Sequence, residues 1–95
     1  MVLEEFLPLV GQWFLADCEP EPVKLKLVEA APYRPNSVDP RPPFALLFYT
    51  GPDARLLEGT YTLRCGAFGP DLIHLGDMLP PRGAEAGFYY QAHFN

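Results

Sequence analysis

The sequence predicts a small all-β domain, an antiparallel six-stranded barrel or sandwich preceded by a short N-terminal helix. Three observations lead to this prediction. Six short runs of apolar or alternating residues recur along the chain, and proline or glycine lies between most of them. The length of 95 residues suits one domain, residues 1–95, and leaves no room for a second. Hydrophobic residues make up 48% of the chain, which is too many for a disordered protein.

The first ten residues predict only a short helix. Their apolar side chains follow the spacing of one helix face, but Pro8 lies inside the pattern and would cost a helix interior about 3 kcal/mol. We therefore expect one or two helical turns that end at Gly11, which can adopt a left-handed cap. The apolar face of these turns should close one end or one face of the sheet.

Six strands are expected from the period-two alternation of side chains. They span residues 12–18, 23–30, 44–50, 59–65, 71–79 and 88–94. Residues 31–43 form a long loop with five prolines, which can neither pair regularly in a sheet nor form a helix, and residues 66–70 connect the fourth and fifth strands. The shared alternation predicts a core of Phe6, Trp13, Leu25, Leu27, Phe44, Leu46, Phe48, Tyr61, Leu63, Tyr90 and Phe94.

Charge and composition exclude several partners and locations. The net charge is −5, and the seven lysines and arginines form no basic stripe, so binding to nucleic acid or to an anionic membrane is not expected. No apolar run approaches the about 20 residues of a membrane helix. The acidic start, residues 1–5, is unlike a signal peptide, so we expect a cytoplasmic protein, with export by a dedicated machine left open.

No catalytic or metal centre is predicted. The only serine, Ser37, lies in the proline-rich loop without the glycine-flanked turn of a nucleophile. His74 and Asp77 are close in sequence, but on a strand they would point to opposite faces and could not bind one metal. Cys18 and Cys65 each lie in a predicted strand and are expected to be free, buried thiols. We therefore predict no enzyme activity, no metal and no cofactor.

The third predicted strand is apolar on both faces, so its second face should be covered by something. The proline-rich loop leads into this strand and carries tyrosine and arginine, which are enriched at interface hot spots. The predicted partner-binding residues are Tyr33, Arg34 and Arg41 in the loop and Ala45, Leu47 and Tyr49 on the strand. The alternative is that the N-terminal helix covers this face.

Four sequence blocks together resemble a family of short bacterial proteins described as a domain of unknown function. The blocks are residues 6–11, 43–48, 59–63 and 90–95. The family is loosely associated with phage-tail-collar-like genes, so the resemblance implies a role beside a fibre or appendage, and it supplies no catalytic residues.

The sequence therefore favours a non-catalytic binding or structural module that contacts another protein chain in a larger assembly. A homo-oligomer is one form that such an assembly could take. The alternative is a β-barrel that binds a small molecule in its interior, which would need a cavity of roughly several hundred Å³.

Overall fold

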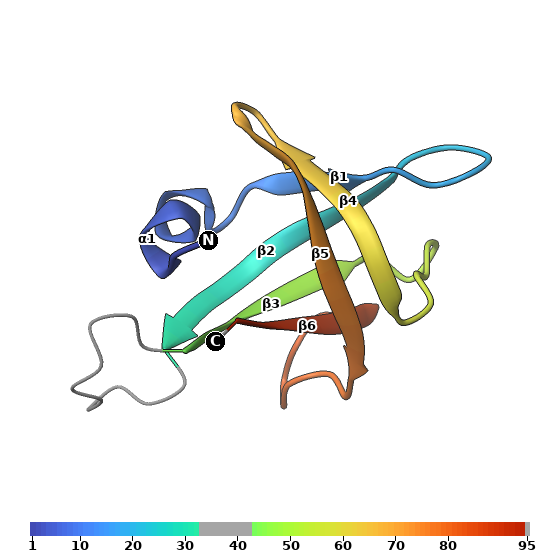
Figure 1. Ribbon diagram of the computed structural model, residues 1–95. Coiled ribbons are helices and arrows are strands. Elements are labelled where there is room, and N and C mark those ends of the chain that lie inside the picture. The colour runs from blue at the N-terminus through green and yellow to red at the C-terminus, as the bar shows by residue number, and fades with distance from the viewer. Residues whose placement is uncertain (33–42, 95) are drawn as a thin grey trace.

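The computed structural model describes residues 1–32 and 43–94, which form a closed antiparallel β-barrel preceded by a short helix (Figure 1). The strands are β1 (Trp13–Ala16), β2 (Val23–Pro32), β3 (Phe44–Thr50), β4 (Gly59–Cys65), β5 (Phe68–Met78) and β6 (Phe88–Phe94). Their order around the barrel is β1-β2-β3-β6-β5-β4. The predicted fold class is confirmed, and of its two forms the barrel is the one adopted.

The barrel closes where β4 pairs with β1, and this seam is short. Only Leu15↔Arg64 and Ala16↔Leu63 are paired there, and the Asp17 amide extends the seam by donating to Thr62 O at 3.0 Å. The Arg64 guanidinium donates through two nitrogens to the two carboxylate oxygens of Asp17. A side-chain contact thus supports the seam where few backbone pairs are present.

The fifth strand begins earlier than predicted, because the connection from β4 is a tight turn at Gly66 and Ala67. Phe68 already pairs with Cys65, while Asp71 pairs with Leu63. Gly69 and Pro70 therefore oppose a single residue of β4, which makes a β-bulge. A bulge tolerates the missing amide hydrogen of proline, so the sequence signal for a longer loop was wrong.

The barrel interior is filled by side chains, as expected for a barrel of fewer than eight strands. Phe14, Leu25, Phe48 and Tyr90 are fully buried there, and the rings of Phe14 and Phe48 meet edge to face at 5.3 Å. Most of the predicted core is buried as expected. Tyr61 and Phe94 are only partly buried and pack against the core from its margin.

Trp13 contradicts the core prediction, since it is 49% exposed and its neighbour Phe14 is fully buried. The register places Phe14 opposite Leu25, which points inward, and Trp13 opposite Lys26, which points outward. The first strand holds four consecutive apolar residues, so no polar side chain marks which face is wet. The prediction therefore assigned Trp13 to the inner face of the strand, whereas Phe14 lies there.

The N-terminal helix closes one end of the barrel, as predicted. Helix α1 (Leu3–Phe6) continues into a 3-10 turn, η1 (Leu7–Leu9), and Gly11 follows with φ of 91°. Phe6 is fully buried, and its ring lies 5.0 to 5.9 Å from three other phenylalanine rings. These are Phe44, Phe68 and Phe94. No helix in residues 1–32 or 43–94 is long and apolar enough to cross a membrane.

Candidate binding groove

A row of large side chains crosses the outer face of four adjacent strands. Trp13 of β1 lies opposite Lys26 of β2, Lys26 lies opposite Tyr49 of β3, and Tyr49 lies opposite Tyr89 of β6. Their inward-pointing neighbours fill the barrel, so this row must point outward. Three aromatic rings and the lysine side chain therefore lie on the same face of the sheet.

A β-bulge in β2 widens this surface next to the row. Leu27 pairs with Phe48 and Glu29 pairs with Leu47, which leaves Val28 as the extra residue. Val28 is 39% exposed, and Glu29 is exposed as well, so two successive side chains face solvent. The bulge thereby places an apolar and an acidic side chain beside Leu47.

The loop between β5 and β6 forms a wall along this surface. The Tyr49 hydroxyl donates to Ala86 O at 2.9 Å, and the Tyr89 hydroxyl donates to Glu85 O at 3.0 Å. Burial of the Tyr89 ring, with Tyr49 and Glu85 beside it, raises the pKa of its phenol. Gly87 allows the loop to approach, because a Cβ at this position would lie 2.6 Å from Tyr49 Cε1 and would also clash with Thr50 O.

The result is a groove of about 590 Å³ that is open to solvent. Its floor is the aromatic row together with Val28 and Leu47, and its far wall carries Pro81, Ala84 and Glu85. Val10 and Gly11 border it near the helix, because Gly11 N–H donates to Leu27 O at 2.7 Å and holds this segment against β2. Within residues 1–32 and 43–94, the charged groups that line the groove are Lys26, Glu29 and Glu85.

Two of the predicted partner-binding residues, Leu47 and Tyr49, line the groove. Ala45 lies on the same strand and is partly buried, but it is not among the groove residues. Tyr33, Arg34 and Arg41 lie outside the described residues. The buried Phe6 of the N-terminal helix packs on the rings at the barrel end, and the residues that follow the helix, Val10 and Gly11, border the groove.

Comparison with family models matched residues 1–94 to a domain of unknown function, DUF6916. The chain belongs to the DUF6916 family. No curated protein and no solved structure matched the chain. The match agrees with the resemblance to a family of unknown function, and it carries no link to phage-tail genes or to bacteria.

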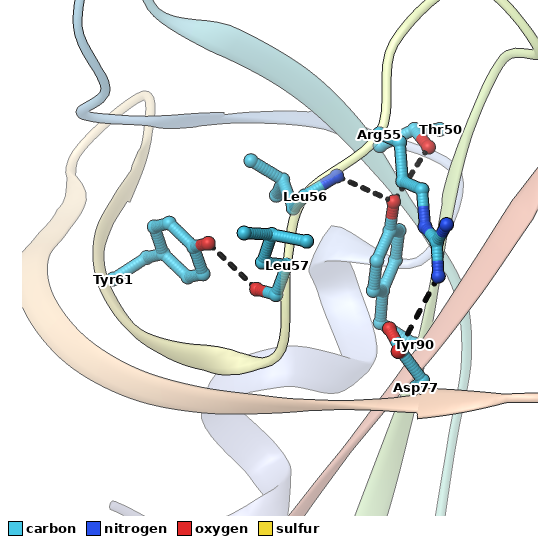
Figure 2. A network of polar contacts seen from close by, with 7 residues as sticks. All are labelled: Thr50, Arg55, Leu56, Leu57, Tyr61, Asp77 and Tyr90. Carbon is cyan, nitrogen blue, oxygen red and sulfur yellow. Dashed lines mark hydrogen bonds and ion pairs between the residues drawn. The ribbon is translucent and has the colours of Figure 1, made fainter.

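A network of polar contacts lies at the end of this DUF6916 barrel where β3 ends and β6 begins, away from the rings on which Phe6 packs. Figure 2 shows this network. The Tyr90 hydroxyl accepts a hydrogen bond from the buried amide of Leu56 at 2.9 Å. The Thr50 hydroxyl donates to Ala54 O at 2.8 Å, so Tyr90 must donate to Thr50 Oγ1 at 3.0 Å. These contacts fix the segment after β3 over the barrel end.

Two exposed contacts flank this network in Figure 2. Arg55 lies 3.7 Å from the Asp77 carboxylate. Its guanidinium also lies over the ring of Phe88, which Figure 2 does not draw, at 5.3 Å. The Tyr61 hydroxyl donates to Leu57 O at 2.6 Å. These contacts stabilise the barrel end, since each of these side chains has a partner within the domain.

The two cysteines of this DUF6916 domain, Cys18 and Cys65, lie apart from each other. Cys18 and Cys65 are free, as predicted, but they are partly and not fully buried. Burial raises the pKa of both thiols, with Asp17 adding to the effect at Cys18. The β1–β4 register places them four residue positions apart, about 13 Å along the strands, which is too far for a disulfide. In the described part of the chain no group of three or more histidine, cysteine or acidic residues could hold a metal ion.

The sequence reasoning missed Trp13, Val28, Tyr89 and the loop wall as parts of the groove. Trp13 lies opposite Lys26, which alternates with two buried leucines, but the register that pairs these two strands is not written in the sequence of β1. The loop that covers Tyr89 to 6% exposure leaves no pattern in the sequence.

Proposed function

We propose that this protein is a non-catalytic binding module that contacts another protein chain through the groove on the outer face of β2, β3 and β6. The observation that carries the proposal is the aromatic row of Trp13, Tyr49 and Tyr89, which lines one groove beside Val28 and Leu47. Trp13 is the exposed end of this row at 49%, and Tyr89 is its covered end at 6%. Aromatic residues are enriched and charged residues are depleted at the centres of protein interfaces.

The chemistry of the groove supports protein binding over catalysis. Aromatic and aliphatic side chains form most of its floor, and two of its tyrosine hydroxyls already donate to loop carbonyls. Groups held in this way are poorly placed to donate protons to a substrate. They are well placed to present fixed rings, which reduces the entropy lost when a partner binds.

A ligand inside the barrel, the second function considered, has less support. The interior positions are occupied by side chains such as Phe14, Phe48 and Tyr90, each fully buried. A barrel that binds a ligand internally usually needs eight or more strands to leave room for it. The groove of about 590 Å³ lies instead outside the barrel wall.

The larger setting of this contact is part of the proposal. We place the module in the cytoplasm, in an assembly that is neither a membrane nor a nucleic-acid complex, because the net charge of −5 disfavours anionic surfaces. A fibre or phage-tail-like assembly in a bacterium is supported only by the four resembling sequence blocks.

The test is an affinity purification of the tagged full chain from its native host after chemical crosslinking. Leu47→Lys places a charge on the groove floor, and Leu72→Lys places the same charge on the exposed outer face of β5, away from the groove. We expect the Leu72→Lys variant to retain the wild-type partners and the Leu47→Lys variant to lose one of them. If a folded Leu47→Lys variant retains every partner, the groove is not the contact surface.

A further inference from the structure

We propose that the groove binds a proline-rich segment of a partner protein in the polyproline II conformation, with a basic residue next to the prolines. This inference rests on the proposed function and names the chemistry of the partner. It follows from the pairing of the strands, the spacing of the rings and the charges at the groove.

The pairing of the floor strands excludes a partner that adds a strand. Strand β2 pairs with β1 and β3, and strand β3 pairs with β2 and β6, so the ladder groups beneath the groove are already used. A bound chain must therefore be held by side chains. Polyproline II segments bind in this way, on aromatic-lined grooves, because they have no internal hydrogen bonds and little entropy to lose.

The backbone spacing of Trp13 and Tyr49 is close to the repeat of a polyproline II helix. Trp13 and Tyr49 lie in one cross-strand row with β2 between them, so their backbones are about 9.6 Å apart. A polyproline II helix presents the same face every three residues, a rise of about 9.3 Å. Two prolines that are three residues apart would therefore meet Trp13 and Tyr49 in turn.

The polar groups of the groove fit the backbone of such a segment. Lys26 lies between the two rings and can donate to carbonyl oxygens, which are all unpaired in a polyproline II backbone. The indole of Trp13 is 49% exposed and offers a further donor at the same surface. Hydrogen-bond donors between aromatic rings can therefore satisfy the free carbonyl oxygens of a polyproline II backbone.

The charges at the margins favour a basic residue beside the prolines. Glu29 on the bulge and Glu85 on the loop wall are both exposed. Neither carboxylate forms a salt bridge within residues 1–32 and 43–94. Among the described groove residues, these two carboxylates outnumber the single cation, Lys26. The net charge of −5 adds a longer-range attraction for a cation.

The experiment titrates the full chain into a fluorescein-labelled octaproline peptide with an arginine at each end, and follows anisotropy. The control peptides replace alternate prolines with glycine or both arginines with glutamate. Trp13 is the only tryptophan, so a change in protein emission upon adding unlabelled peptide reports binding at the groove. We expect saturable binding that weakens at least about tenfold with either control peptide.

Trp13→Ala should weaken binding at least about tenfold, since exposed aromatic anchors dominate such interfaces. The control is Leu72→Ala, which removes an exposed leucine outside the groove and should leave the affinity unchanged. A double change, Glu29→Lys with Glu85→Lys, should weaken the binding of the arginine peptide and strengthen the binding of the glutamate peptide.

The inference is overturned if the arginine peptide does not bind, if the glycine peptide binds equally well, or if Trp13→Ala has no effect. It is also overturned if sedimentation shows a dimer that Leu47→Lys dissociates, because a second copy then occupies the groove. If the peptide does not bind but the Leu47→Lys variant still loses a host partner, the further inference fails and the proposed function stands. Retention of all partners by Leu47→Lys would contradict the proposed function itself.

Discussion

Tyr49 and Tyr89 pack against each other on the outer face of the barrel, with ring centroids 5.0 Å apart and an interplanar angle of 47°. They are direct cross-strand neighbours, and their hydroxyls donate to the successive carbonyls of Ala86 and Glu85. The same two rings therefore form the groove floor and hold its wall. A partner would meet a surface whose geometry is set before binding.

Gly87→Ala should disrupt this wall. The glycine has φ of 150°, and an added Cβ would lie 2.6 Å from Tyr49 Cε1, so either the ring or the loop must move. We expect a loss of about 1–3 kcal/mol in the free energy of unfolding, measured by chemical denaturation. Gly51→Ala is the matched control, because no atom lies within 4 Å of its Cβ, and it should change stability by under about 0.5 kcal/mol. Equal stability of the two variants would contradict the loop packing.

Phe6→Ala should open the barrel end that the helix closes. The side chain is fully buried among the rings of Phe44, Phe68 and Phe94. Truncation of a buried phenylalanine costs about 3–5 kcal/mol, and denaturation should show a loss in that range. Leu7→Ala removes an adjacent side chain that is 49% exposed and should cost under about 1 kcal/mol. A comparably small loss in Phe6→Ala would mean that the helix does not plug the barrel.

The strands were predictable because their signals are local. Lys24 and Lys26 alternate with buried leucines in β2, and this fixes both the strand and its wet face. The third strand was predicted to be apolar on both faces, and two residues of its second face, Leu47 and Tyr49, line the groove. In each case neighbouring residues carry the whole pattern.

Features that depend on distant contacts were not predictable in this way. Barrel and sandwich could not be separated, because closure depends on the pairing of Ala16 with Leu63 and of one neighbouring pair. Trp13 was placed inside because its strand has no polar residue to set the phase. The groove wall depends on Gly87 approaching Tyr49, a contact between segments that are far apart in the sequence.

Tyr90→Phe should destabilise the opposite end of the barrel through a single lost hydroxyl. The hydroxyl accepts from the buried Leu56 amide and donates to Thr50 Oγ1, so its removal leaves a buried donor without a partner. We expect a loss of about 1–3 kcal/mol in thermal or chemical unfolding. Tyr61→Phe removes an exposed hydrogen bond to Leu57 O and should cost less than Tyr90→Phe. The reverse order would contradict the network in Figure 2.

The two thiols should make the domain less stable at alkaline pH. Burial raises the pKa of Cys18 and Cys65 above the ordinary thiol value of about 9, so the folded state keeps protons that the unfolded state releases. Their contribution is present in full below pH about 9 and is lost as the pH rises through that value and beyond. We expect the free energy of unfolding to fall more steeply between pH 8 and pH 10 in the wild type than in a Cys18→Ala, Cys65→Ala double variant. The comparison concerns the slopes, so any loss of packing in the variant does not affect it. Parallel curves would show that the thiols titrate alike in the folded and unfolded states.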